Sequence, residues 1–442
     1  MSLNRIQHFR GIFLLVGVIT GCGGGDAGSE VSSDTEEKIA IAPIQTTELN
    51  AARVAEAAGI TASIDSPSKV AEPEVAKPDS ASAMGDAKLP FPDDDATKTL
   101  QEIQKLRIAA LPTDIQEVKA ARRERNERIV DMATKVLRLT MNDEARKPQF
   151  HQAVGQLLEA RFQMALSGTK DDIGLLYEDV QALNERDPKS VAAAEGVYYV
   201  AKFAHTQAGL HGKSQPVWFE TLSHWAREFA DRFPEQAQRS VSLLFGAARS
   251  CELHSEATKD AEVAARLTTE CRLCYTTLAD KFATTEQGQE AIASLRRMAL
   301  VGQQLSQFSG PTADGGFVSA DEFPGKPTVI YFWESDSEEF NSELLPELEK
   351  IRSQLPADRL RVIGVALDDD ESTINSFMET HVVPGQQIFF PNTAQRSWNS
   401  PLIRFWGIAK TPTVWLIDSN GKVVSTTVVA DDLANQIKKL AK

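Results

Sequence analysis

Two cysteines in the middle of the chain have the spacing used in thiol–disulfide exchange. Cys271 and Cys274 are separated by two residues, but they lie within a helical run that no strand precedes, which is the wrong setting for a redox motif. Cys251 lies on the preceding helical run, and with His254 it adds a zinc-like composition. Three interpretations stay open: a structural disulfide or buried thiols, a zinc site, or a redox pair that supplies sulfur to another part of the chain.

A second candidate site is the turn after the apolar stretch 328–333. Its residues are Glu334-Ser335-Asp336-Ser337-Glu338-Glu339-Phe340, and a helical run to Leu355 follows. A helix N-terminus at such a turn stabilises a thiolate, yet this turn offers only carboxylates, hydroxyls and one phenyl ring. We expect Asp336 and Glu339 to form a capping box. The alternatives are retained peptide binding or a cation site built from the acids of the turn, namely Glu334, Asp336, Glu338 and Glu339.

Length and charge limit what the chain can be. At 442 residues it is too long for one core. Its formal net charge of −15 argues against nucleic acid as a partner, because nucleic-acid binding needs a basic face. The sequence contains no phosphate-binding loop, nucleophile elbow or metalloprotease helix. We therefore expect no cofactor and no metal.

The first 22 residues have the pattern of a targeting segment. Arg5 and Arg10 precede an apolar stretch that is too short to span a bilayer. The stretch Ile19-Thr20-Gly21-Cys22 resembles a bacterial lipobox, in which Cys22 becomes lipidated. This resemblance implies a lipid-anchored protein of the bacterial cell envelope that faces the periplasm, and Gly23 favours the outer membrane. An ordinary secretory signal with an incidental cysteine is the alternative.

Residues 23–95 read as a linker. They are rich in small residues, proline and acids and contain almost no aromatic side chains. A segment of this composition cannot bury enough apolar surface to fold. We expect a disordered, self-repelling tether, and we interpret the aspartates at 93–95 as solvated charges.

Residues 96–305 show helical periodicity. Apolar residues recur at spacings of three and four in the ranges 118–139, 150–166, 173–183, 191–203, 218–233, 237–253, 261–282 and 290–301. Similar segment ends recur about every 46 to 49 residues, a period typical of stacked helical hairpins. The region resembles tetratricopeptide-like solenoids, and an irregular helical bundle is the competing architecture.

Residues 306–442 change to a mixed pattern. Apolar stretches typical of strands occur at 328–333, 360–367, 387–390, 413–418 and 423–429, and helical stretches at 344–355, 372–380, 394–406 and 433–440 separate most of them. The last two strands are joined by a turn at 419–422. This order predicts an α/β domain with a mixed sheet after the helical region.

Three segments of this domain resemble one protein family. The stretch Phe323-Pro324-Gly325-Lys326-Pro327 with the strand up to Phe332-Trp333 resembles the entry strand of the redoxin or TlpA-like branch of the thioredoxin superfamily. The run Val362–Asp368 is similar to its second core strand, and Lys410-Thr411-Pro412-Thr413 is similar to its cis-proline loop. The resemblance implies a thioredoxin-like fold over residues 306–442 and a peptide-binding groove formed by Trp333, Asp336, Ser337, Thr411 and Pro412.

The reaction centre of that family is missing. Aligned from the strand, the two family cysteines fall on Ser337 and Phe340, and aligned from Pro346 they fall on Glu338 and Asn341. Serine cannot form a disulfide, and no histidine lies nearby in sequence to activate it. We therefore expect a redox-inactive module that binds protein or peptide partners. The alternative is a thiol–disulfide oxidoreductase that uses Cys271 and Cys274.

Overall fold

The computed structural model describes residues 94–440, and these belong to one compact unit of the chain. The expected signal segment with Cys22 and nearly all of the expected linker lie outside the described residues. Within the described part, no helix is both long enough and apolar enough to cross a membrane.

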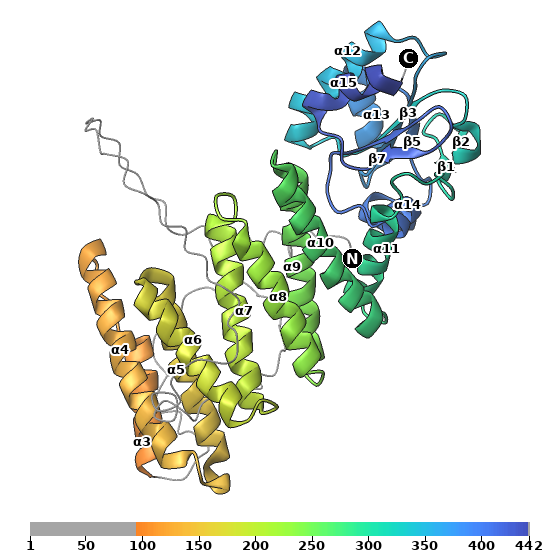
Figure 1. Ribbon diagram of the computed structural model, residues 1–442. Helices are drawn as coiled ribbons and strands as arrows, with labels where there is room; N and C mark the ends of the chain where they lie inside the picture. Colours follow the sequence, from red (N-terminus) through yellow and green to blue (C-terminus); the bar gives the residue numbers. More distant parts are fainter. Residues whose placement is uncertain (1–93, 441–442) are drawn as a thin grey trace. The chain divides into compact units, whose positions relative to one another are not determined.

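The first part of the described chain is built of antiparallel helices (Figure 1). The helices are α3 (Asp95–Ile108), α4 (Ile115–Thr140), α5 (Lys147–Ser167), α6 (Lys170–Arg186), α7 (Val191–His211), α8 (Val217–Arg232), α9 (Ala237–Ala257), α10 (Ala261–Lys281) and α11 (Glu286–Met298), with a short 3₁₀ turn η1 (Glu144–Arg146) before α5. Helix α3 begins inside the expected linker, because the side chain of Asp94 accepts a hydrogen bond from Thr97 N–H and caps the helix.

Polar contacts between successive hairpins have the period that the sequence predicts. Each helix packs against the next, and α5 with α7 and α8 with α10 also touch. Many side-chain bonds join residues about one hairpin apart, including Arg239 to Glu195 at 2.5 Å and Arg266 to Glu220 at 3.1 Å. The ends of α6, α8 and α10 therefore recur at the expected spacing because each hairpin stacks on the one before it.

The C-terminal part contains a five-stranded sheet in the order β5-β4-β3-β6-β7. The strands are β3 (Thr328–Trp333), β4 (Arg361–Ala366), β5 (Gln386–Ile388), β6 (Thr413–Ile417) and β7 (Val423–Ser425). The strands β3, β4 and β5 run parallel, and β6 runs antiparallel to β3 and β7. This is the mixed sheet that the sequence predicts, with β3 at its centre.

Both faces of the sheet are covered by apolar side chains. One face packs against α12 (Leu345–Gln354), α13 (Glu371–Thr380) and α15 (Ala430–Leu440), and the other packs against α14 (Pro401–Trp406) and the chain around Phe308. All six residues of β3 are buried, as expected for a strand covered on both faces. The turn after β3 therefore follows directly from a fully buried central strand.

The outer strands of the sheet are also paired. A hairpin of β1 (Ser309–Pro311) and β2 (Phe317–Ser319) lies beside β5, where Phe389 N–H donates to Pro311 O at 2.9 Å. At the opposite edge, residues 302–305 pair with the β7 hairpin, and Val423 N–H donates to Gln303 O at 2.9 Å. The sequence did not indicate the β1–β2 hairpin, because its strands have three residues each and alternate too briefly to give a pattern.

The helix expected at 394–406 is wrong in its first half. Residues 393–399 form two short 3₁₀ turns, η4 (Thr393–Gln395) and η5 (Ser397–Asn399), and only α14 is helical. Ser397 has a φ of 54°, which is outside the helical region. Pro401 then starts the helix, where its missing N–H is not needed.

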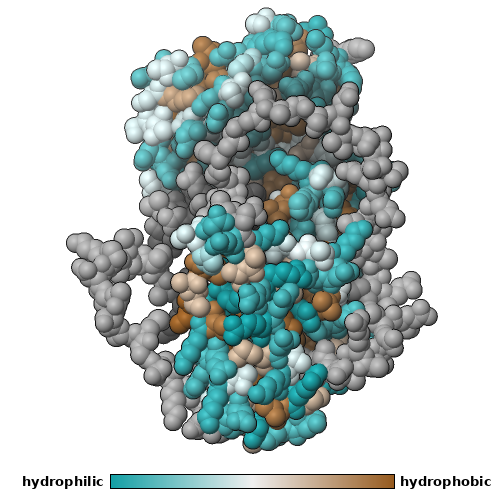
Figure 2. Space-filling view, turned by 90° about the vertical axis from the view of Figure 1, so that its left-hand side faces the viewer, coloured by the Kyte–Doolittle hydropathy of each residue, from teal (hydrophilic) through white to brown (hydrophobic). Residues whose placement is uncertain are grey.

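The surface in view in Figure 2 is mostly hydrophilic, with hydrophobic residues in small separate patches. Large apolar side chains that are exposed are scattered through the described elements, for example Ile108, Leu210, Phe317 and Val382. Scattered exposure of this kind is ordinary for a soluble protein.

Candidate functional site

Ser337, onto which the alignment from the strand places the first family cysteine, caps the helix. Its Oγ accepts a hydrogen bond from Phe340 N–H at 3.2 Å, and its carbonyl accepts from Asn341 N–H at 3.0 Å. The expected capping box of Asp336 and Glu339 is therefore wrong by one residue. Because Ser337 is the N-cap, the N3 position falls on Phe340, which has no side-chain acceptor to complete a box.

Phe340, onto which the same alignment places the second cysteine, fills the core. Its ring is fully buried and stacks on Trp333 with centroids 4.8 Å apart and on Tyr331 at 6.0 Å. Phe377 of α13 completes this aromatic cluster. A large side chain in such a cluster contributes apolar burial and ring contacts, so Phe340 has a structural role here.

The helix after the turn starts with one turn of π-helix, η3 (Phe340–Leu344). Leu345 N–H donates to Phe340 O, five residues back. The next residue, Pro346, has no N–H and crowds the carbonyl of Ser342. The proline therefore favours the wider turn at the point where α12 begins.

Glu334 joins three loops at the end of β3. Its carboxylate accepts from Trp398 Nε1 at 3.0 Å and from the Thr411 hydroxyl at 2.5 Å. The Thr411–Pro412 peptide bond is cis, as the candidate cis-proline loop suggested. The turn after β3, the turn η5 and the cis-proline loop are thus connected by one side chain.

A second carboxylate lies at the end of β4. Asp368 accepts from the Ser335 hydroxyl at 2.5 Å and from Ser335 N–H at 3.3 Å. Burial raises the pKa of both Glu334 and Asp368, and the neighbouring charge of Asp336 raises both further, although hydrogen bonds oppose the shift. These two carboxyls accept the hydrogen bonds that hold the turn in place.

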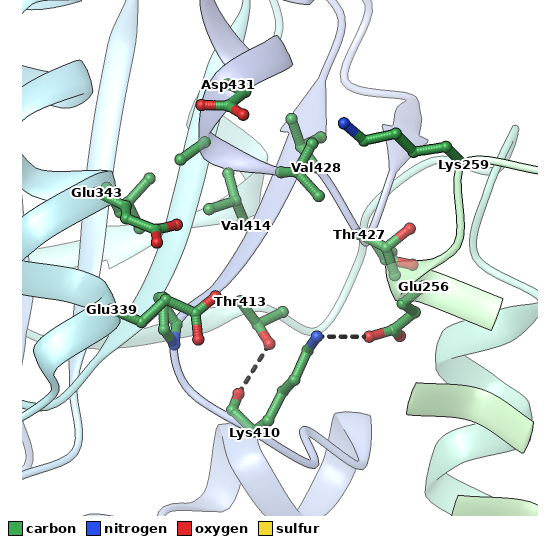
Figure 3. Close-up of a pocket in the computed structure, with 15 residues that line it drawn as sticks. Glu256, Lys259, Glu339, Glu343, Lys410, Thr413, Val414, Thr427, Val428 and Asp431 are labelled. Atoms are coloured by element: carbon green, nitrogen blue, oxygen red, sulfur yellow. Dashed lines mark hydrogen bonds and ion pairs between the residues drawn. The ribbon is translucent and has the colours of Figure 1, made fainter. Parts of the chain in front are cut away.

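A cleft lies beside the cis-proline loop (Figure 3). Its volume is about 260 Å³. The cleft is lined by residues from the helical region, from η3, from the cis-proline loop and from the segment before α15: Glu256, Lys259, Glu339, Glu343, Leu344, Lys410, Pro412, Thr413, Val414, Thr426, Thr427, Val428, Val429, Ala430 and Asp431. It is therefore formed by segments far apart in the sequence.

The expected groove residues are distributed differently. Pro412 lines the cleft, whereas Thr411 contacts Glu334 beside it. Trp333 is not a groove residue, because it is fully buried and its Nε1 donates to Gln387 Oε1 at 3.0 Å. Asp336 and Ser337 lie on the turn, outside the lining of the cleft.

Sequence reasoning missed the charged residues of the cleft. Glu256 and Lys259 come from the end of α9 and the loop after it, and Asp431 comes from the first turn of α15. No local pattern connects these positions. The one available signal was Lys410, which stands two residues before Pro412.

The three described cysteines are buried free thiols in α9 and α10. Cys274 Sγ lies 3.1 Å from Ser223 Oγ, and Cys251 Sγ contacts Phe219 O at 3.7 Å. Burial raises the pKa of Cys251 and Cys271, and it raises the pKa of Cys274 to about 11. Of the interpretations left open, buried thiols match this arrangement, and the disulfide is not formed.

The zinc interpretation has no support in the described residues. His254 packs its ring on Phe219 with centroids 4.7 Å apart. Among residues 94–440, no group of three or more histidine, cysteine, aspartate or glutamate side chains is placed to hold a metal ion. This applies equally to the acids of the turn after β3.

The helical region contacts the sheet domain through α11 and α14. Arg297 Nε donates to Trp406 O at 3.2 Å, and the guanidinium of Arg296 lies 4.0 Å over the ring centroid of Phe405. Lys410, in the loop before the cis-proline, pairs with Glu256 of α9 at 3.1 Å. Glu256 of α9 thus lies at the edge of the cleft, paired with Lys410.

Known proteins resemble the C-terminal part. The sequence profile described as "AhpC/TSA family" matches residues 301–426. Similar solved structures include a thioredoxin domain of a thiol-disulfide oxidoreductase from Bacteroides vulgatus (22% identity, 32% of this chain and 98% of that chain, TM-score 0.29). A thiol-disulfide oxidoreductase from Bacteroides fragilis is also similar (19% identity, 31% and 99%, TM-score 0.28).

A third similar structure is a thiol:disulfide interchange protein from Chlorobium tepidum (20% identity, 31% and 96%, TM-score 0.26). A search of curated proteins finds no match. The strand order, the cis-proline and the family profile agree for the same stretch of chain. Residues 301–426 therefore match the profile of the AhpC/TSA family, and they form a thioredoxin-like domain that follows a mostly helical region.

Proposed function

We propose that this chain is a lipid-anchored protein of the bacterial cell envelope whose thioredoxin-like domain binds protein or peptide segments without redox chemistry. The proposal rests on the structural roles of Ser337 and Phe340, the two positions that the alignment from the strand assigns to the family cysteines. Ser337 caps a helix, and Phe340 is stacked in the core. Both positions have structural roles that a thiol pair would not fill.

Chemistry at the turn supports this proposal. No cysteine follows Cys274 in the sequence, so the domain has no sulfur for exchange with a substrate disulfide. The Ser337 hydroxyl is occupied by the helix N–H, and Glu334 and Asp368 are occupied by hydrogen bonds within the turn. What the domain retains from its family is the cis-proline loop with a cleft beside it.

Redox activity through Cys271 and Cys274 is the competing proposal, and the described residues give it little support. A redox-active cysteine needs an exposed thiolate with a lowered pKa. Both of these thiols are fully buried, and burial raises their pKa values. We therefore expect slow reaction with disulfide substrates.

An insulin-reduction assay on the full chain tests this choice. We expect no turnover above background in wild type or in C271S/C274S, while a thioredoxin control is active. Titration of the folded protein with a thiol reagent should show slow reaction of the three buried cysteines. Turnover in wild type that C271S abolishes would overturn the proposal.

The anchor rests on the N-terminal sequence, where Cys22 ends the lipobox-like stretch. Labelling cells with a radioactive fatty acid should label wild type and not C22S. The variant should also leave the membrane fraction. Equal labelling and equal membrane association of the two proteins would contradict the lipid anchor. The proposal that the domain binds peptides would not be affected.

A further inference from the structure

The cleft beside Pro412 has an uneven distribution of charge. Glu339 and Glu343 of the helix start lie on one side, and Asp431 lies next to them at the start of α15 (Figure 3). The opposite side is formed by Glu256, Lys259 and Lys410. Four carboxylates and two lysines therefore surround this space.

One of the two lysines is held by the helical region. Lys410 Nζ pairs with Glu256 Oε2 at 3.1 Å, and the Glu256 side chain is only 15% exposed. Arg297 approaches the same carboxylate at 3.9 Å, which helps to fix its place. Lys410 is thus directed away from Glu339 and Glu343, so it does not neutralise them.

The floor of the cleft is apolar. Leu344, Val414 and Val428 are buried and line it from three different segments. A volume of about 260 Å³ is below the ~300–1,000 Å³ of typical small-molecule sites. It suits one long side chain and the peptide backbone next to it. Lysine and arginine combine an apolar stem with a charged end, and they match an apolar floor beside carboxylates.

We propose that the occupant of this cleft is an extended peptide segment of a partner protein that carries a lysine or arginine side chain. The stem of that side chain packs on Val414 and Val428, and its charged end lies between Glu339 and Glu343. Glu256 determines this preference because it holds Lys410 away. The inference rests on the proposed peptide-binding function and adds the chemical class of the ligand.

Selection from a random dodecapeptide library displayed on phage tests the proposal on the full chain. We expect wild type to enrich peptides with lysine or arginine, and peptides so selected to bind about fivefold more weakly to E339Q/E343Q, as the loss of two partly exposed charge pairs implies. The affinity should also fall with added salt.

The matched control is E338Q/E349Q. These two acids lie on the same stretch of helix, are exposed and do not line the cleft, so the control has the same change in net charge. We expect it to bind the selected peptides as wild type does. An equal loss in both variants would show a general charge effect and overturn the proposal.

A separate pair of variants tests the role of Glu256. E256Q releases Lys410, so binding of the selected basic peptides should weaken, and E256Q/K410M should recover it. Wild-type affinity in E256Q would contradict this role. Enrichment of acidic or uncharged peptides would contradict the proposed preference for basic peptides but would leave the peptide-binding function in place. If the library yields no peptide whose binding depends on the cleft, the proposed peptide-binding function itself is contradicted.

Discussion

The ring of Phe340 is packed in the core of the sheet domain. It makes contacts with Tyr331, Trp333 and Phe377 that a cysteine side chain is too small to make. We expect F340A to lower the free energy of unfolding by about 3–5 kcal/mol, the usual cost of removing a buried aromatic ring. Urea unfolding followed by tryptophan fluorescence measures this.

The same substitution at an exposed site serves as control. Phe317 in β2 is 60% exposed, and F317A should stay within about 0.5 kcal/mol of wild type. A similar small loss for F340A would mean that the aromatic cluster does not stabilise the turn.

Because of Glu334, the stability of the folded protein should depend on pH. The pKa of Glu334 in the folded protein is raised above the ordinary value of 4.5, so the folded state holds this proton more strongly than the unfolded state does. The stabilising contribution is therefore complete below pH 4.5 and is lost as the pH rises through the folded pKa.

In the variant E334Q, the side chain at position 334 does not ionise as the pH rises. The difference in melting temperature, wild type minus E334Q, should fall as the pH rises from about 4 to 7. Asp368, whose pKa is also raised, is present in both proteins and drops out of the difference. A difference that is constant with pH would contradict the role assigned to Glu334.

At the scale of elements, Glu252 of α9 connects three helices. It accepts from Arg249 at 2.8 Å and from the Tyr275 hydroxyl at 2.6 Å, and it also pairs with Arg297 of α11. All four side chains are buried. Removing one partner of a buried network leaves uncompensated charge.

We therefore expect E252Q to cost about 3–5 kcal/mol in the free energy of unfolding. The comparison is E220Q, because Glu220 pairs with Arg266 on the surface of the same region, and a pair of this kind contributes about 1 kcal/mol or less. Urea denaturation of both variants measures the contrast. Equal losses would mean that burial does not strengthen the Glu252 network.

The sequence predicts the elements better than it predicts their contacts. Periodicity was sufficient for the helices α4 to α11 and for β3, β4 and β6, because each of them has enough residues to show a pattern, but it did not single out α3. It failed at 394–399, where a positive φ at Ser397 interrupts the helix that the apolar spacing predicts. The cap at Ser337 was also missed, since Asp336 is an equally good capping residue and the choice depends on tertiary contacts.

Prediction of the candidate site from the sequence has the same limit, because contacts between distant segments leave no local pattern. The resemblance of the loop at Pro412 to a cis-proline loop and the absence of cysteine from the turn follow from local sequence, whereas the cis bond itself is seen only in the structure. The grouping of Glu339, Glu343 and Asp431 around the cleft could not be predicted, because Asp431 lies far from the other two in sequence. The Glu256–Lys410 pair could not be predicted either, because its residues meet only when α9 packs against the sheet domain.

At the scale of the whole described chain, Gly407 lies where α11 meets α14. Its φ is +60°, and a Cβ added there would lie 2.5 Å from the backbone nitrogen of Ser294 in α11. Alanine at this position combines an unfavourable backbone conformation with a clash against another helix. We expect G407A to be more destabilising than a left-handed conformation alone explains.

Gly302 separates the two effects. Its φ is +84°, but a Cβ would meet nothing within 4 Å, so G302A should cost only about 1 kcal/mol. In G407A, amide hydrogen exchange should accelerate in both α11 and α14, and in G302A it should not. Equal behaviour of the two variants would show that the contact between α11 and α14 does not couple the two regions.

The paired edges of the sheet restrict how this protein associates with others. Residues of the β1 segment occupy the side of β5, and residues 302–305 occupy the side of β7. A partner strand would find no open row of backbone donors and acceptors at either position. Growth of fibres by strand addition at the outer sides of β5 and β7 is hindered in the same way.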